Sequence, residues 1–268
     1  MGSALRRARG EGATGPLIRI LSIAAAAFFV LPLIGLAARA PWGEAWDRLR
    51  QPEVIDALRL SLVVSSSALL ISLVLGAPLA YVLARERFPG RRLLRGLVVL
   101  PMVLPPVVAG VGLLTALGRR GILGGALGSL GVSLPFTTAA AAIAAAFVAA
   151  PFLVVTLEAG FVSVDRRLEE AAATLGASRL VIFRTVTLPA VAPSLAAGAT
   201  LCWARALGEF GATIIFAGNL SGRTQTGPLA IYQELQTGEF DGAILLSLVL
   251  FVVSLSVLIA LRARITVR

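Results

Sequence analysis

Two charged residues lie four positions apart inside a long apolar stretch of the chain. A helix over this stretch would place Arg205 and Glu209 on one face, one turn apart. A charge that stands alone in the hydrocarbon core of a membrane costs about 2.5 kcal/mol or more, so we expect the two side chains to form an ion pair. The residues alone leave two roles open for such a pair: it lines a polar pathway, or it fixes the packing of helices.

The chain lacks the side chains that several other chemistries need. It has neither Lys nor His, and all 24 of its basic residues are Arg. A P-loop requires Lys to hold phosphates, and structural metal sites use His or clusters of Cys. The one cysteine, Cys202, lies in an apolar run, where a small buried side chain is expected. We therefore predict that the chain is not an enzyme, has no ATPase site of its own, and binds no metal or cofactor.

The elements that must position Arg205 and Glu209 are membrane helices. Hydrophobic residues make up 57% of the chain, charged residues make up 14%, and the mean hydropathy is +0.90, which exceeds what a soluble domain needs for its core. A helix needs about 20 apolar residues to cross the hydrocarbon core. The sequence predicts an all-α polytopic membrane protein with six transmembrane helices, over Ile20–Ala38, Leu60–Ala84, Gly96–Leu117, Ala139–Leu157, Leu195–Ala217 and Ala243–Leu261.

The net charge of +10 comes from short Arg clusters between the apolar runs. Because no aromatic residues alternate with these clusters, we predict no nucleic-acid binding. With the N-terminus inside, the inner segments contain more than twice as many Arg residues as the outer ones, so we expect both termini in the cytoplasm. We expect the first span to be retained, and a signal peptide cleaved near Ala40 is the alternative.

Residues 163–193 form the long inner loop between the fourth and fifth predicted spans. Asp165 can cap a first short helix, and Gly176 can end that helix in a left-handed conformation. Ser178 can then cap a second helix. The pattern predicts two short helices, which either contact a partner or lie on the lipid surface as an amphipathic stretch.

Part of this loop is similar to a known signature. Glu170-Ala171-Ala172 is followed four residues later by Gly176, and then by Val186-Thr187-Leu188-Pro189. This spacing resembles the EAA-type signature of bacterial ABC importer permeases, which have the type I importer fold. In that family the loop is the coupling helix, which contacts a separate ATP-binding subunit. The resemblance implies an ATPase-coupling site made of Asp165, Glu169, Glu170, Ala171, Ala172, Gly176 and Pro189.

Two other segments resemble the molybdate permeases of this superfamily. One is Leu104–Gly110 followed by Gly118–Gly121, and the other is Gly208–Thr213 followed by Gly222–Thr226. With the signature loop, the resemblance extends from about Leu60 to Leu261. The implied organisation is a tail, first helix and periplasmic loop over residues 1–57; an importer transmembrane domain of five core helices over residues 58–262, with coupling helices at about 163–189; and a cytoplasmic tail over residues 263–268.

The resemblance also implies a function and partners. The chain would be the permease subunit of an ATP-driven importer of molybdate in a bacterial inner membrane; tungstate, sulfate or thiosulfate import, or a standalone secondary transporter, are the alternatives. The expected partners are a second copy of the chain, two ATP-binding subunits that hold ATP and Mg, a periplasmic oxyanion-binding protein and the lipid bilayer. We expect the translocation pathway to involve Thr200, Arg205, Glu209, Thr213, Asn219, Arg223, Thr224 and Gln225.

Overall fold

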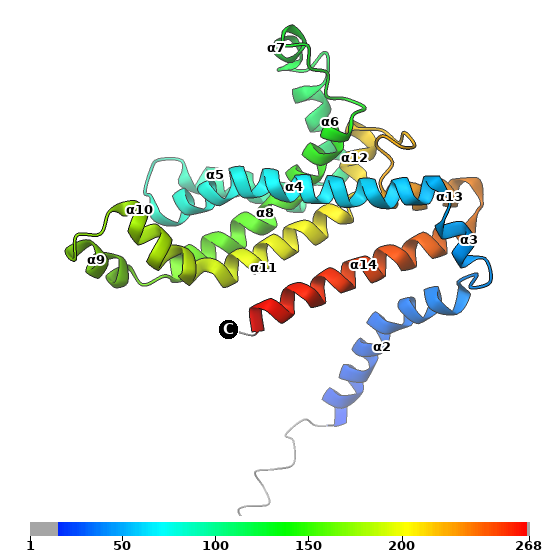
Figure 1. Cartoon of the computed structure of the whole chain (residues 1–268), viewed down its shortest axis with the longest axis horizontal. Helices are drawn as coiled ribbons and strands as arrows, with labels where there is room; N and C mark the ends of the chain where they lie inside the picture. Colours follow the sequence, from blue (N-terminus) through cyan, green and yellow to red (C-terminus); the bar gives the residue numbers. More distant parts are fainter. Residues whose placement is uncertain (1–15, 267–268) are drawn as a thin grey trace, which may run out of the picture.

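The computed structural model describes residues 16–266, and no β-strand occurs in that range. Its helices are α2 (Pro16–Arg39), α3 (Ala45–Leu49), α4 (Pro52–Arg85), α5 (Arg91–Val103), α6 (Pro106–Leu117), α7 (Gly124–Ser129), α8 (Thr138–Ser163), α9 (Arg166–Thr174), α10 (Arg179–Ile182), the π-helix η1 (Phe183–Thr187), α11 (Leu188–Leu207), α12 (Gly211–Phe216), α13 (Gly227–Thr237) and α14 (Phe240–Thr266) (Figure 1). The predicted all-α membrane fold is confirmed. The predicted tail before residue 16 and the last two residues lie outside the described part.

Five helical stretches among the described residues are long and apolar enough to cross a membrane. They are Pro16–Arg39, Pro52–Arg85, Thr138–Ser163, Arg179–Leu207 and Phe240–Val257. The first, second, fourth and sixth predicted spans each lie within or largely within one of these stretches. The other two predicted spans differ from the expectation of continuous helices, and both differences have a local cause.

The core of the bundle is the contact of α8 with α4 on one side and α11 on the other. α8 supplies a run of buried Ala residues, and Gly76 of α4 approaches α8 so closely that an added Cβ would lie 2.9 Å from Val154 Cγ2. Five small residues recur at spacings of three and four along one face of α4, and all are buried: Ser61, Ser65, Ala68, Ser72 and Gly76. Small residues on one face let helices approach closely, and their burial indicates that α4 uses this face for packing.

The third predicted span is two helices, which corrects the expectation of one helix over 96–117. α5 ends at Val103 and α6 begins at Pro106. Pro105 has no N–H to donate, and a proline also disfavours the helical conformation of the residue before it. Leu104 and Pro105 are accordingly extended, with ψ of 137° and 132°. The bend turns α6 away from α5 and brings it against α12 (Figure 1).

The fifth predicted span is also divided, which corrects the expectation of one helix over 195–217. α11 ends at Leu207, and Gly208 occupies its C-terminal cap. The chain then restarts as α12, because Glu209 Oε1 accepts a hydrogen bond of 2.8 Å from the backbone N–H of Ala212. The carboxylate therefore does the work of an N-cap for a short second helix.

The ion pair predicted for Arg205 and Glu209 is present at this break. Arg205 Nη1 lies 2.8 Å from Glu209 Oε2, and the side chains of the two residues are 29% and 1% exposed. Arg205 belongs to the last turn of α11, where the helix dipole favours a cation, and Glu209 precedes α12, where the dipole favours an anion. The pair therefore joins two helix ends instead of lying on the face of one helix.

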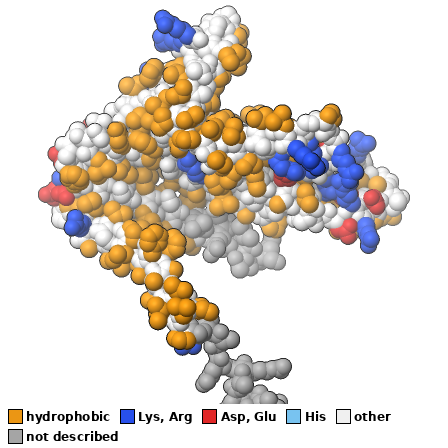
Figure 2. Space-filling view, turned by 180° about the vertical axis from the view of Figure 1, so that it is seen from behind, with side chains coloured by type: hydrophobic (Ala, Val, Ile, Leu, Met, Phe, Trp, Pro, Cys, Tyr) orange, Lys and Arg blue, Asp and Glu red, His pale blue; other side chains and the backbone are white. Residues whose placement is uncertain are grey.

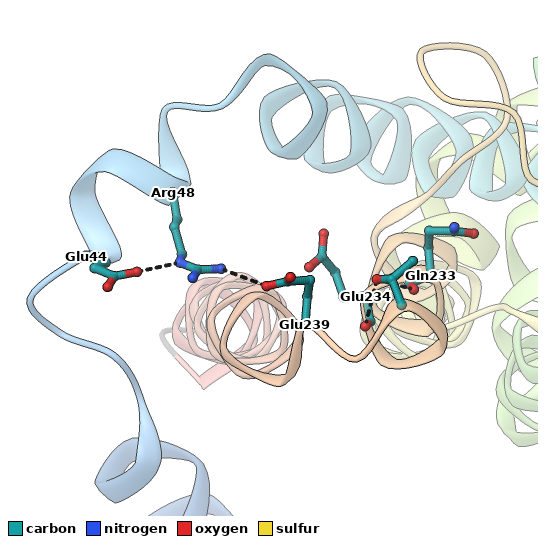
Figure 3. Close-up of polar contacts among 6 residues, drawn as sticks. Glu44, Arg48, Gln233, Glu234 and Glu239 are labelled. Atoms are coloured by element: carbon teal, nitrogen blue, oxygen red, sulfur yellow. Dashed lines mark hydrogen bonds and ion pairs between the residues drawn. The ribbon is translucent and has the colours of Figure 1, made fainter.

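An exposed polar cluster connects α3 with the turn between α13 and α14, at the end of the molecule far from α9 (Figure 3). Arg48 of α3 donates a hydrogen bond of 3.0 Å to Glu44 and lies 3.9 Å from Glu239, between α13 and α14. The hydrogen bond with Glu44 is the main cause that raises the pKa of Arg48 above its ordinary value. Because Glu44 and Glu239 are 66% and 62% exposed, these ion pairs contribute little stability.

The pair at the helix break predicts an ordered series of stabilities. Glu209→Ala removes the acceptor for the Ala212 N–H and leaves Arg205 without its partner, so we expect the free energy of unfolding to fall by about 3–5 kcal/mol. Glu209→Gln keeps an acceptor oxygen and should lose about half of that. The double variant Arg205→Ala/Glu209→Gln should lose less stability than the two single variants lose together. Melting temperatures of the solubilised chain would test this, and strictly additive losses would contradict the pairing.

Candidate functional site

The first candidate site is the surface formed by α9, α10 and η1 at one end of the bundle (Figure 1). Asp165 Oδ1 accepts a hydrogen bond of 2.9 Å from the backbone N–H of Arg167, and Ser178 Oγ accepts one of 3.4 Å from that of Val181. Gly176 has φ of +83°, a conformation in which other residues are strained. The first short helix predicted for this loop and the caps at Asp165 and Ser178 are confirmed. The expectation of a second short helix is wrong, because the helix that Ser178 caps continues through η1 and α11 to Leu207.

Glu169 holds this loop onto the bundle. Its Oε1 accepts hydrogen bonds from Arg85 Nη2, at 2.8 Å, and from Thr187 Oγ1, at 2.6 Å. Arg85 is the last residue of α4, and Thr187 ends η1 directly before α11. One carboxylate oxygen therefore ties α9 to two membrane helices. Glu169 faces the bundle, whereas the neighbouring Glu170 is exposed, so two residues that the sequence assigned to one contact surface lie on different sides of α9.

The outer side of the loop exposes an unusual amount of apolar surface. Leu168, Leu175, Leu180 and Val181 are 57%, 88%, 61% and 47% exposed. Exposed apolar groups gathered on one segment mark a surface that contacts another macromolecule or a lipid. Of the predicted coupling residues, all but the half-buried Glu169 and Ala172 are exposed beside these side chains, namely Asp165, Glu170, Ala171, Gly176 and Pro189.

Glu158 is a buried acid at the same end that the sequence interpretation missed. It lies one residue beyond the predicted end of the fourth span, and α8 continues past it to Ser163. Arg95 of α5 donates to both of its carboxylate oxygens. Bidentate pairs of this kind are strong and fix orientation. The sequence did contain a signal for this pair: an acid follows an apolar run, and an Arg-rich loop elsewhere in the chain could supply its partner. Basic side chains gather at this end of the molecule (Figure 2).

The second candidate site is the break between α11 and α12. Thr213 Oγ1 is buried there and has no hydrogen-bond partner among the described residues. Arg205 is the more exposed member of its ion pair, whereas Glu209 is committed to Arg205 and to the start of α12. Thr200 lies farther back on α11 and donates a hydrogen bond of 2.7 Å within its own helix. Two groups at this break keep hydrogen-bonding capacity: the buried Thr213 hydroxyl and the partly exposed Arg205 guanidinium.

The two short helices beyond the breaks pack closely, because a glycine of each helix lies against a side chain of the other. A Cβ added to Gly110 of α6 would lie 2.7 Å from Ile215 Cβ, and one added to Gly211 would lie 2.6 Å from Pro106 Cβ. Contacts this short require glycine on both helices. α6 and α12 therefore form one unit, which follows the breaks at residues 104–105 and 208–210 and packs against α8 in the hydrophobic core.

The loop after α12 contains the other predicted pathway residues, and they differ in position. Thr224 is fully buried, and its hydroxyl is bonded to the backbone of its own loop on two sides. Asn219 donates a hydrogen bond of 3.2 Å to Gln233 of α13. Gln225 is half-buried and Arg223 is exposed. Only Arg223 among these four presents its side chain fully at the surface, and Thr224 has a structural place in the loop.

Comparison with known proteins places the chain among transporters. A family model described as "Binding-protein-dependent transport system inner membrane component" matches residues 72–268. The molybdenum transport system permease protein ModB of Mycobacterium tuberculosis is 42% identical over 243 residues, covering 91% of this chain and 92% of the relative. The ModB protein of Haemophilus influenzae is 47% identical over 68% of this chain and 80% of the relative. The sulfate transport system permease protein CysT of Salmonella typhimurium is 37% identical over 87% and 85%.

Solved structures support the fold. A bacterial ABC transporter involved in the import of alginate matches with a TM-score of 0.72 at 20% identity, over 93% of this chain and 95% of that chain. An amino acid ABC transporter matches with a TM-score of 0.57 at 19% identity, over 81% and 94%. These identities are too low to indicate a substrate. The family match and the close sequence relatives agree, and the chain belongs to the family of binding-protein-dependent transport system inner membrane components, as an ABC importer permease of the ModB and CysT type.

Proposed function

We infer that this chain is the membrane-spanning subunit of an ATP-driven importer that moves molybdate into the cytoplasm. The observation that carries this proposal is the extent of similarity to molybdenum transport permeases, at 42–47% identity, against 35–37% for the sulfate permeases. Tungstate, sulfate and thiosulfate remain the alternatives, because sulfate permeases match over nearly the same length. A standalone secondary transporter is disfavoured by the exposed loop at α9, which has no use in a transporter that works without a motor subunit.

The proposed partners follow from the family. A second copy of the chain would complete the pathway, and two ATP-binding subunits would hold ATP and Mg and contact the surface at α9. A periplasmic protein would deliver the anion; a solved alginate transporter that shares this fold is described in complex with a periplasmic protein. The chain itself performs no covalent chemistry and binds no cofactor.

Elementary electrostatics supports the need for a gated, wet pathway. Moving a bare ion into a low-dielectric interior costs on the order of 20 kcal/mol, so a dianion requires water and polar groups for its whole path. The break between α11 and α12 offers the Arg205 guanidinium and the Thr213 hydroxyl at such a path. Glu209 is neutralised by Arg205, which limits its repulsion of an anion. Arg223, exposed in the next loop, would attract the anion or contact the delivery protein.

The proposed orientation puts the α9 surface in the cytoplasm and the loop after α12 in the periplasm. Arg-rich loops stay on the cytoplasmic side, and the loop from Arg85 to Arg95 lies at the α9 end, because Arg85 bonds to Glu169. Both termini then lie in the cytoplasm of the cell. The division of the chain into residues 1–57, 58–262 and 263–268 is retained as a proposal, with the observation that α14 continues to Thr266.

We propose a mechanism of coupling that uses this geometry. ATP binding would draw together two motor subunits and move the two copies of α9. Since Glu169 bonds to Arg85 and Thr187, the movement would pass to α4 and α11 instead of being absorbed in the loop. The α6–α12 unit, which packs against α8, would then change its position and expose the pathway to the other side.

The substrate is predicted to be molybdate. In a bacterium that lacks its own molybdate uptake, expression of this chain with its ATP-binding and delivery proteins should restore accumulation of molybdenum. We expect unlabelled tungstate to compete strongly and sulfate weakly, since delivery and pathway must hold a tetrahedral dianion of matching size. Elemental mass spectrometry of washed cells would measure this, with the same cells lacking the chain as the control. Strong competition by equimolar sulfate would assign the chain to sulfate instead.

The coupling surface predicts an uncoupled phenotype. Glu170→Arg reverses an exposed charge on α9, and Gly176→Pro destroys the left-handed turn after it; each should lower ATP-driven uptake by at least about tenfold, because a mismatched interface costs several kcal/mol. The chain should remain in the membrane at normal level. Glu53→Arg is the matched control, since it reverses an exposed charge at the far end of α4. Uptake and stimulated ATP hydrolysis at the wild-type rates in both α9 variants would contradict the assignment.

The orientation is predicted by where a single thiol reacts. Ser221 is exposed in the loop after α12, whereas the native Cys202 is fully buried. In a Cys202→Ala background, Ser221→Cys should react with a membrane-impermeant maleimide added to intact spheroplasts. Protection by the loaded delivery protein would place the docking surface here. Labelling only after the cytoplasmic side is opened would reverse the orientation.

A further inference from the structure

A hollow lined by four arginines together with Phe88, Gly90 and Leu93 lies beside the start of α5. Its volume is about 540 Å³, and its charged walls are Arg87, Arg91, Arg92 and Arg95, with the backbone of Gly90 between them. It lies at the same end of the bundle as α9, because α4 ends at Arg85 just before it. Nothing in the proposed transport or coupling steps uses these side chains.

The positive charges around this hollow repel one another. α5 has no acidic residue in its first turn and no side-chain cap; it begins instead with Arg91 and Arg92 at the positive end of the helix dipole. Gly90 adopts φ of +85° before the helix, and the Arg91 N–H donates a hydrogen bond of 3.4 Å to the Phe88 carbonyl, while the next N–H groups of the first turn have no acceptor within the helix. Cations, a helix N-terminus and no local acid together favour a bound anion.

The arginines differ in what neutralises them. Arg95 is satisfied by Glu158 of α8. Among the described residues, Arg87, Arg91 and Arg92 form no ion pair, and Arg91 Nε is buried without a hydrogen-bond partner. The exposed Glu86 is the acid nearest in sequence and leaves an excess of positive charge. A buried guanidinium donor without an acceptor indicates a missing oxygen ligand.

A separate apolar cavity lies farther along α5. Arg91, Arg95, Val98 and Pro101 recur at spacings of four and three, so they share one face of the helix. Val98 and Pro101, with Leu97, line a cavity of about 310 Å³ whose other walls are α4, α8 and Leu113 of α6. The lining is almost wholly apolar. Arginines at the end of the helix and a hydrocarbon-lined cavity one to two turns deeper form an amphipathic site.

We propose that this site binds an anionic phospholipid, with its phosphate among Arg87, Arg91 and Arg92 and an acyl chain in the cavity beside Val98. Basic pockets between membrane helices hold phosphate-type oxyanions, and a free dianion would satisfy the arginines equally. The apolar cavity farther along α5 assigns the site to the lipid, because a free anion has nothing to place there. The position of the site in the cytoplasmic leaflet rests on the proposed orientation; binding of the lipid does not depend on the transported substrate.

The test compares two lipids with the same acyl chains on the purified full-length protein. Native mass spectrometry should show dioleoyl-phosphatidylglycerol retained in preference to dioleoyl-phosphatidylcholine, with a first site of higher affinity than the rest. Arg91→Gln/Arg92→Gln should weaken that first site by about 25-fold, since each basic residue near an anionic headgroup contributes about fivefold. Arg119→Gln/Arg120→Gln, which removes two exposed charges from the segment between α6 and α7, should leave it unchanged.

Several outcomes would overturn the assignment. One is an equal loss of phosphatidylglycerol in the two double variants, or no preference for it in the wild type. Another is displacement of the first phosphatidylglycerol by millimolar molybdate or inorganic phosphate, which would make the site one for a free anion. Arg92→Gln alone, at an exposed position, should still weaken the site about fivefold if the double variant fails to fold. Uptake assays on the same variants keep a failure of the transport proposal distinct, because lipid retention is measured without a substrate.

Discussion

The arrangement of this protein depends on one constraint, which is that hydrocarbon satisfies no backbone hydrogen bond and no charge. Both helix breaks obey it through local chemistry. At residues 104–106 two prolines have no N–H groups that could be left unsatisfied. At residues 208–210 the Glu209 carboxylate accepts the N–H of Ala212 and is itself balanced by Arg205. A broken helix can therefore exist in this membrane protein only where the sequence supplies its own hydrogen-bond acceptor or removes the donor.

A second constraint follows, because lipid provides no hydrophobic drive for helices to associate. Close approach of small residues has to supply the attraction. An added Cβ on Gly160 of α8 would lie 2.5 Å from Ser194 Cβ of α11, and one on Gly198 of α11 would lie 3.3 Å from Leu153 Cδ1. α8 and α11 thus approach each other closely at these glycines, as α4 and α8 do at Gly76, whereas α2 has no buried residue at all. The bundle is therefore held by close contacts of small residues at particular positions along α4, α8 and α11.

The sequence was sufficient for the elements that repeat simple patterns. Apolar length located the spanning helices, and the caps at Asp165 and Ser178 located α9 and α10. It failed at residues 96–117 and 195–217, because hydropathy sums over a window and cannot distinguish a continuous helix from two helices in series. It also could not show which of Glu169 and Glu170 faces the bundle, since that depends on how α9 packs against α4 and η1. The ion pair of Arg95 with Glu158 was out of reach because its partners are far apart in the chain.

A single continuous helix connects the two candidate sites. The chain is continuously helical from Arg179 at the α9 surface to Leu207 at the break. A straight helix of these 29 residues would be about 43 Å long. Glu169 bonds to Thr187 within this helix and to Arg85 at the end of α4. A displacement of α9 must therefore either break a partly buried, charge-assisted hydrogen bond or move this helix. Because Arg205 lies in the last turn of the same helix and is paired with Glu209, whose carboxylate accepts the Ala212 N–H, a movement of the helix reaches the first residues of α12.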